Sequence, residues 1–88
     1  LSFQGDNAVT EVIMPKWGLT MEAGNVGAWR KAEGDRVAQG EILVEIATEK
    51  ITNELESPVD GVLTQIFCPE GSEDVPVGTV ICVIEEAA

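Results

Sequence analysis

The feature that most constrains the fold is an internal repeat. The segment Gly24 to Gly34 aligns with the segment Gly61 to Gly71 at an offset of 37 residues. One extra residue in the turn Ser72-Glu73-Asp74 then raises the offset to 38. Three further pairs follow at that offset: Val37 and Val75, Gly40 and Gly78, Ile46 and Ile84. Such a duplication predicts a quasi-twofold molecule in which each half contributes equivalent elements.

Every segment of suitable length in this chain has the composition of a β-strand. The only stretch with passable helical composition, Ala28 to Ala38, is interrupted by the turn sequence Glu33-Gly34-Asp35, so we interpret it as strand, turn and short strand. The other segments are rich in β-branched and large apolar residues, and glycine, proline or acidic turns separate most of them. The expected strands are Val9 to Met14, Val26 to Arg30, Ile42 to Ala47, Ile51 to Glu56, Val62 to Phe67 and Val80 to Glu85.

These strands and the repeat together predict an all-β fold. We expect a flattened β-barrel or sandwich of two four-stranded antiparallel sheets with quasi-twofold symmetry, a barrel-sandwich hybrid. The two halves differ in one place. Pro15 precedes Gly24 by nine residues, whereas Pro58 precedes Gly61 by three, so the first half carries an extra loop, Lys16 to Ala23.

Four glycines of the repeat have a structural explanation. Gly34 and Gly40, with their equivalents Gly71 and Gly78, lie in turn sequences where glycine supplies a positive φ. No GxGxxG or phosphate-loop spacing accompanies them. The sequence therefore gives no support to nucleotide binding.

Charge and length exclude several classes of function. The 88 residues make one domain, and the formal net charge of −11, from 5 cations against 16 anions, disfavours nucleic acid and anionic lipid because their phosphates would be repelled. No apolar run approaches the roughly 20 residues of a membrane helix. We expect a soluble domain, with no nucleic-acid or membrane partner, that binds partners with basic surfaces.

The chain lacks the usual means of catalysis. It contains no histidine, which removes the commonest general base and the commonest metal ligand. Cys68 and Cys82 lie in Val/Ile-rich segments without a second pair, so we expect buried, reduced thiols. We therefore predict no catalytic residue, no metal site and no enzyme activity of the isolated domain.

Lys50 is the most informative single residue. It is the last positive charge in the chain, because the 38 residues after it contain no Lys or Arg. If Ala47 ends one strand and Thr52 begins the next, Thr48-Glu49-Lys50-Ile51 is a hairpin connection whose tip points into water. That geometry suits covalent modification of an amine. The plain alternative is a solvated turn lysine.

The stretch EGDRVAQGEILVEIATEKITNELESPVDGVL resembles the lipoyl domains of the acyltransferase components of 2-oxo-acid dehydrogenase complexes. In these domains the lysine of an acidic-Lys-aliphatic turn carries lipoic acid. The similarity runs from about Val9 to Glu86 and includes the Met14-Pro15 start and the segment Thr20-Met21-Glu22. The segments PKWGLTM and ATEKITNE are most similar to acetoin-cleaving and related complexes.

The resemblance implies specific site residues. Lipoic acid would be attached covalently to Lys50, and a lipoylating enzyme would read the flanking Glu49 and Ile51. Glu49 replaces the commoner aspartate and keeps its charge. The extra loop would lie near the lipoyl turn and recognise a partner decarboxylase through Lys16, Trp17, Gly18, Leu19 and Thr20.

The resemblance also implies partners and boundaries. The partners would be a lipoate ligase or lipoyl transferase, a thiamine-dependent decarboxylase, an acyltransferase core and dihydrolipoamide dehydrogenase. The carrier domain would span residues 7–86 as a monomer, in a bacterial cytoplasm rather than a mitochondrial matrix. We interpret residues 1–6 as the remnant of an expression tag and residues 87–88 as the start of a linker.

One surface feature remains open. Glu45, Glu49, Glu54 and Glu56 cluster in sequence around Lys50, where they steer the arm toward a basic active site or only keep the domain soluble.

The two tryptophans have different expected settings. Trp29, equivalent to Ile66, is expected in a core or half-buried strand position. Trp17 lies in the extra loop, where an exposed aromatic marks a contact surface.

Three other kinds of domain share part of this pattern. A biotin carrier shares the fold but normally has methionine on both sides of its lysine, where this chain has Glu49 and Ile51. A lipoyl-like structural module, as in membrane-fusion adaptor proteins, lacks the turn lysine. A glycine-cleavage carrier has longer helical additions without a counterpart here.

Overall fold

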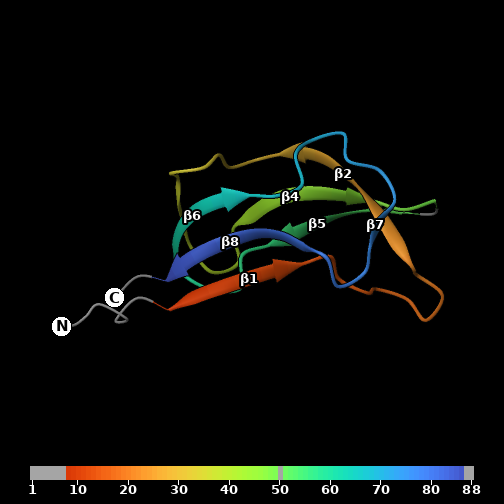
Figure 1. Cartoon of the computed structure of the whole chain (residues 1–88), viewed down its shortest axis with the longest axis horizontal. Coiled ribbons are helices and arrows are strands. Elements are labelled where there is room, and N and C mark those ends of the chain that lie inside the picture. Colours follow the sequence, from red (N-terminus) through yellow and green to blue (C-terminus); the bar gives the residue numbers. More distant parts are fainter. Residues whose placement is uncertain (1–7, 50, 87–88) are drawn as a thin grey trace.

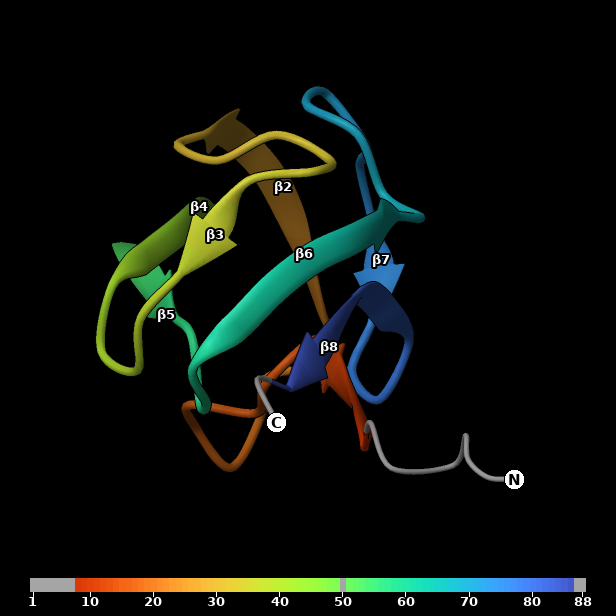
Figure 2. The same cartoon turned by 90° about the vertical axis from the view of Figure 1, so that its left-hand side faces the viewer.

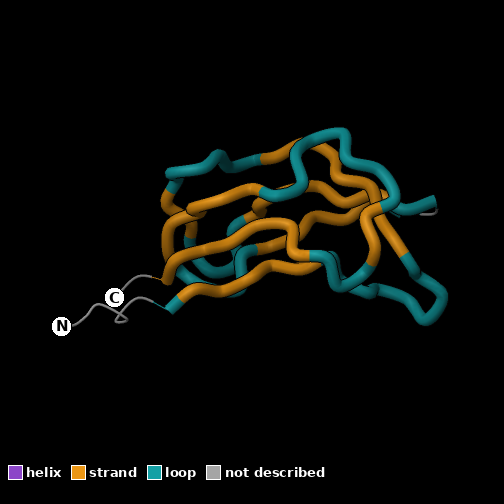
Figure 3. Tube along the Cα trace, in the orientation of Figure 1, coloured by secondary structure: helices purple, strands orange, loops and turns teal. Residues whose placement is uncertain are grey.

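The computed structural model describes residues 8–49 and 51–86. Over these residues the chain forms eight strands and no helix (Figures 1 and 3). The strands are β1 (Val9–Ile13), β2 (Ala23–Trp29), β3 (Arg36–Val37), β4 (Ile42–Ala47), β5 (Thr52–Glu56), β6 (Gly61–Ile66), β7 (Val75–Pro76) and β8 (Val80–Glu86). The part described thus holds no helix that could span a membrane.

The strands form two four-stranded antiparallel sheets, as predicted. Their orders are β1-β8-β6-β3 and β5-β4-β2-β7. Figure 2, which views the molecule from the end where β1 begins and β8 ends, shows the strands arranged around the space between the sheets. The pairing does not close the sheets into a barrel, so of the two forms expected, flattened barrel or sandwich, the molecule takes the sandwich.

Five of the six expected strands differ from the prediction at one or both ends, mostly by one residue, and one further strand was missed. β2 begins at Ala23 instead of Val26 because Ala23 and Gly24 pair with β7. β7 itself was not predicted, since a two-residue strand containing Pro76 has no readable alternation. β5 begins at Thr52, which leaves Ile51 in the turn.

The quasi-twofold symmetry extends to the hydrogen-bond register. Subtracting the repeat offsets from the β6–β8 pairs Val62–Glu85, Leu63–Ile84 and Ile66–Cys82 gives the β2–β4 pairs Asn25–Ala47, Val26–Ile46 and Trp29–Val44. The edge strands are equivalent as well. Val9 to Val12 pair with β8 as Thr52 to Leu55 pair with β4, and the same irregularity follows in both ladders. The duplication therefore includes β1 and β5, which sequence alignment alone did not pair.

The two halves are interleaved. β3 of the first half pairs with β6 of the second, and β7 of the second half pairs with β2 of the first. The turns repeat this exchange. The Gly34 N–H donates to the Leu63 carbonyl at 2.7 Å, and in the equivalent place the Gly71 N–H donates to the Val26 carbonyl at 2.9 Å. Each half therefore completes the other's sheet.

The core lies between the sheets and draws on both. Leu43, Ile46, Leu63, Ile81 and Ile84 are fully buried, and each such side chain contributes about 1.5–3 kcal/mol relative to exposure. The rest of the buried cluster consists of Val12, Met14, Val26, Val37, Val44, Val75 and Cys82. The four predicted turn glycines have positive φ: Gly34 95°, Gly40 88°, Gly71 95° and Gly78 93°.

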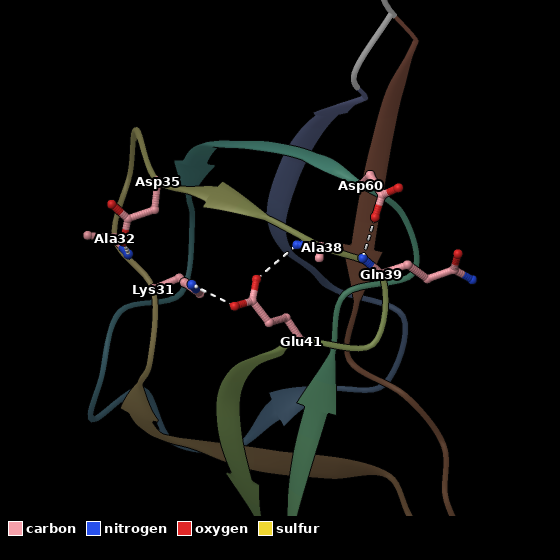
Figure 4. A network of polar contacts seen from close by, with 7 residues as sticks. All are labelled: Lys31, Ala32, Asp35, Ala38, Gln39, Glu41 and Asp60. Atoms are coloured by element: carbon pink, nitrogen blue, oxygen red, sulfur yellow. Dashed lines mark hydrogen bonds and ion pairs between the residues drawn. The ribbon is translucent and has the colours of Figure 1, made fainter.

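Several carboxylates cap turns of the backbone (Figure 4). Glu41 accepts the Ala38 N–H at 2.9 Å and lies 3.0 Å from the Lys31 ammonium, and these two contacts, the backbone bond first, lower the pKa of Glu41. Asp60 accepts the Gln39 N–H at 2.7 Å. Part of the acidic composition thus serves turn geometry.

Candidate functional site

The β4–β5 hairpin brackets the predicted modification site. β4 ends at Ala47, which pairs with Thr52 at the start of β5. The Thr48 N–H donates to the Ile51 carbonyl at 2.7 Å, and the Thr48 hydroxyl lies 3.3 Å from both the carbonyl oxygen and the N–H of Ile51. This confirms the hairpin connection. Lys50 lies outside the described residues.

The two flanking residues are exposed. Glu49 is in the turn, and Ile51 keeps 47% of its surface accessible although it is a large aliphatic residue. An exposed isoleucine beside an exposed carboxylate gives an enzyme both an apolar and a charged group to contact. The roles predicted for Glu49 and Ile51 stay predictions.

The hairpin lies at the opposite end of the molecule from the start of β1 and the end of β8 (Figure 1). The symmetry explains this placement. At the other end the Glu86 N–H donates to the Ala8 carbonyl at 2.8 Å, which is the equivalent of the bond from Thr48 to Ile51. At the end of the molecule opposite the hairpin, the start of β1 and the end of β8 therefore occupy the equivalent position.

The extra loop lies beside the hairpin, as the resemblance implied. The predicted recognition residues Lys16, Trp17, Gly18, Leu19 and Thr20 are all exposed. Residues of the loop and of the hairpin together line a cleft of about 460 Å³. The lining residues are Trp17, Gly18, Thr20, Met21, Glu22, Ala23, Gly24, Asn25, Ala47, Thr48, Glu49, Ile51 and Asp74.

The base of the loop is anchored and its tip projects. The Val77 N–H donates to the Glu22 carbonyl at 2.9 Å, and the Met21 N–H donates to the Gly18 carbonyl at 3.2 Å. Trp17 lines the cleft and is 38% exposed. Leu19 is 96% exposed and does not line the cleft. The loop therefore presents two apolar side chains in two different settings.

Asp74 is a cleft residue that sequence reasoning missed. It comes from the second half of the chain, has a φ of 54°, and donates its N–H to the Asn25 side-chain oxygen at 2.9 Å. The available signal was the change of repeat offset from 37 to 38 in the turn that contains it. An inserted residue marks a place where the two halves must differ.

The acidic cluster around the hairpin is smaller than the sequence suggested. Glu45 is half-buried and pairs with Arg30, so its charge is neutralised within the domain. Glu49, Glu54 and Glu56 are exposed. Electrostatic steering by these three carboxylates stays a prediction.

Trp29 and the cysteines have structural roles. The Trp29 indole N–H donates to the Cys68 carbonyl at 2.9 Å in a half-buried position, as predicted. Both thiols are free; Cys82 is buried, whereas Cys68 is only half-buried, which corrects the expectation for that residue. Burial, with a smaller contribution from Cys68, raises the pKa of Cys82 to about 12, so its thiol is inert at neutral pH.

The family model described as biotin-requiring enzyme, which covers biotin and lipoyl domains, matches residues 10–84. The chain belongs to this family. Its members carry a covalently attached group, and the similar proteins place this chain on the lipoyl side of the family, where the domain is a carrier and not a catalyst by itself.

Two curated relatives are acyltransferase components. The chain is 45% identical over 73 residues to the dihydrolipoyllysine-residue acetyltransferase of the mitochondrial pyruvate dehydrogenase complex of Caenorhabditis elegans, covering 83% of this chain and 14% of that protein. It is 47% identical over 77 residues to the corresponding component of the acetoin cleaving system of Bacillus subtilis, covering 88% and 19%. The chain thus spans less than a fifth of either relative.

A solved structure agrees with this assignment. The lipoyl domain of the 2-oxoglutarate dehydrogenase complex from Azotobacter vinelandii has a TM-score of 0.73 and 28% identity, over 89% of this chain and 98% of that chain. The sandwich of two four-stranded sheets is therefore the lipoyl-domain fold.

Proposed function

We propose that this chain is the lipoyl carrier domain of a dihydrolipoamide acyltransferase, with lipoic acid in amide linkage to Lys50. The observation that carries the proposal is the position of Lys50 in the sequence of a closed β4–β5 hairpin, in a chain that belongs to the biotin/lipoyl family. Family membership supplies the modification, and the hairpin supplies a place where a ligase can reach an amine.

The residues present fit the attached group. The exposed Glu49 and Ile51 would hold the lipoylating enzyme on either side of the lysine, and the adjacent cleft leaves space beside the hairpin. When bound, lipoate supplies a disulfide that accepts an acyl group and two electrons. The protein contributes presentation, because an exposed site on a tethered domain raises the effective concentration of its cargo at each partner.

The proposed partners are those that the resemblance to lipoyl domains implies. They are a lipoate ligase, a thiamine-dependent decarboxylase, an acyltransferase core and dihydrolipoamide dehydrogenase. The relatives from the pyruvate dehydrogenase complex and from the acetoin cleaving system have nearly the same sequence identity to the chain, 45% and 47%. The substrate class we propose is therefore a 2-oxo acid or acetoin. Because the relatives are bacterial and mitochondrial, the prediction of a bacterial cytoplasm gains no support from them.

Lipoylation of the purified chain tests the proposal. Incubation of the apo chain with lipoate, ATP and a lipoate–protein ligase should add the mass of one lipoyl group, located on Lys50 by peptide mapping. Lys50→Arg should gain nothing, and Lys31→Arg is the matched control that should be modified fully. Attachment to Lys16 or Lys31, or modification by a biotin ligase in place of the lipoate ligase, would refute it.

A further inference from the structure

We infer that the cleft between the extra loop and the β4–β5 hairpin is a resting site for the dithiolane end of the lipoyl arm, with Trp17 as its aromatic wall. The inference rests on the proposed function, since it requires the arm on Lys50. It adds a binding site on the domain itself for a cargo that would otherwise be only presented to partners.

Position and size support this occupant. Glu49 and Ile51, the neighbours of Lys50 in the chain, both line the cleft, so the residues on either side of the attachment site are part of its wall. The volume of about 460 Å³ lies in the range of about 300–1,000 Å³ that holds small-molecule ligands. The cleft is therefore both near enough to the attachment residue and large enough for a slender acyl chain with a five-membered ring.

The lining chemistry suits an apolar sulfur heterocycle. Trp17 and Met21 on the loop side and Ala47 and Ile51 on the hairpin side give the cleft apolar walls. Sulfur next to an aromatic ring is a favourable contact. The loop already contains one contact of sulfur with a polar partner, because the backbone N–H of Trp17 donates to the Met21 sulfur at 3.4 Å. A dithiolane in the cleft would meet an aromatic face and a thioether.

The negative charges at the cleft disfavour phosphate-bearing ligands as its occupant. Glu22, Glu49 and Asp74 are exposed there, and the described lining residues include no Lys or Arg. Phosphate-bearing ligands such as coenzyme A or nucleotides would be repelled. Lipoylation removes the charge of the lysine amine and adds no anion, so the lipoyl arm escapes this repulsion.

One wall of the cleft is built by the extra loop, a segment that the duplication does not explain. The loop supplies Trp17 and Met21, whereas the equivalent connection in the second half, from Pro58 to Gly61, is too short to supply any such residues. Leu19 on the same loop does not line the cleft and stays 96% exposed. One loop can therefore hold the resting arm and still offer Leu19 to a partner.

Tryptophan fluorescence tests the inference, because the chain has two tryptophans in different settings. Trp29→Phe leaves Trp17 as the only emitter, and Trp17→Phe leaves Trp29. With complete lipoylation verified by intact mass, the disulfide should quench Trp17 emission relative to the apo chain, and reduction with a phosphine should relieve the quenching. The emission of Trp29 should be the same in all three states.

A second measurement does not depend on replacing Trp29. In the otherwise unchanged lipoylated chain, a bulky water-soluble phosphine should reduce the dithiolane faster in Trp17→Ala than in the parent, by about fivefold, since a single sulfur–aromatic contact biases an equilibrium by about that factor. Leu19→Ala is the matched control on the same loop and should leave the rate unchanged.

The outcomes separate the two proposals. Full lipoylation on Lys50 with unchanged Trp17 emission and equal reduction rates in the parent and Trp17→Ala would overturn the resting site and leave the carrier function intact. Failure of the ligase to modify Lys50 would overturn both. Equal acceleration by Trp17→Ala and Leu19→Ala would show a general loosening of the loop and would also overturn the resting site.

Discussion

At the scale of single residues, equivalent positions of the repeat are not equally tolerant. Gly24 and Gly61 are repeat partners near the starts of the equivalent strands β2 and β6. A Cβ on Gly61 would overlap the Glu85 carbonyl oxygen, which is backbone, whereas a Cβ on Gly24 would come 3.0 Å from the Met14 sulfur and an Ile46 methyl group, which are side-chain atoms. Backbone cannot move aside without breaking the β6–β8 ladder, but side-chain ends can.

This difference predicts a graded series of alanine substitutions. Gly61→Ala should lower the free energy of unfolding by about 3 kcal/mol, and Gly24→Ala by about 1 kcal/mol, because overpacking costs more against rigid atoms. Gly18→Ala is the control, with nothing within 4 Å of its Cβ, and should change stability by less than about 0.5 kcal/mol. Urea denaturation measures all three, and equal values for Gly24→Ala and Gly61→Ala would contradict the argument.

The raised pKa of Cys82 predicts that the free energy of unfolding falls at alkaline pH. Its pKa rises from 9.0 to about 12 on folding, so between these values the unfolded chain loses a proton that the folded chain keeps. The stabilisation is complete below pH 9 and is lost as the pH rises toward 12, with a slope of at most about 1.4 kcal/mol per unit.

The Cys82→Ala variant removes this titration while other groups titrate as before. The difference in unfolding free energy between the parent and Cys82→Ala should therefore shrink as the pH rises from 9 to 10.5, measured by denaturant unfolding under reducing conditions. A difference that stays constant over this interval would show that the thiol ionises as easily in the folded chain as in the unfolded one.

At the scale of elements, the loop between β1 and β2 is the clearest candidate for partner recognition. Leu19 is 96% exposed and lies on the loop beside the hairpin, so its whole side chain is available for burial against a partner, where a large apolar group contributes most of its binding energy. Trp17 on the same loop is partly covered by the cleft. Recognition by the decarboxylase should therefore depend more on Leu19 than on any other exposed aliphatic residue.

Leu19→Ser should lower kcat/KM of the decarboxylase for the lipoylated domain by about tenfold, the loss typical of one buried apolar anchor. Modification by the ligase and the unfolding free energy should not change. Val9→Ser is the matched control, because Val9 is 58% exposed but lies at the opposite end of the sandwich. Equal effects of the two substitutions would refute a specific role of the loop.

At the scale of the whole molecule, the halves depend on each other. Since β3 completes the sheet of β6, and β7 completes that of β2, neither half buries its core alone. The symmetry also places the start of β1 beside the end of β8, where a hairpin turn could join them. The bond from the Glu86 N–H to the Ala8 carbonyl has nearly the length of the bond that closes the β4–β5 turn, 2.8 Å against 2.7 Å.

A circular permutant tests this equivalence. Joining Glu86 to Ala8 through Asn-Gly, a two-residue hairpin turn, and opening the chain between Gly18 and Leu19 in the exposed loop should give a folded domain within about 2 kcal/mol of the parent, since the new turn matches the register at that end. A direct fusion of Glu86 to Ala8 without spacer should be less stable. Equal stability of the two in thermal unfolding would contradict the predicted geometry.

Much of this architecture could be predicted from local sequence patterns. Strand composition, the turns at Gly34, Gly40, Gly71 and Gly78, and the repeat itself depend on residues close together in the chain, because backbone preference and side-chain alternation act over a few residues. The hairpin around Lys50 was predictable for the same reason. The resemblance to lipoyl domains added the meaning of that lysine.

Only the tertiary structure decided which distant segments lie side by side. The equivalence of β1 and β5, the pairing of Glu45 with Arg30, and the cleft that joins Trp17 and Asp74 depend on the register of the two sheets. Register is set by how the whole core packs, and no stretch of a few residues contains that information. The sequence by itself determined the strands, the turns and the candidate lysine, while packing across the sandwich determined what lies beside them.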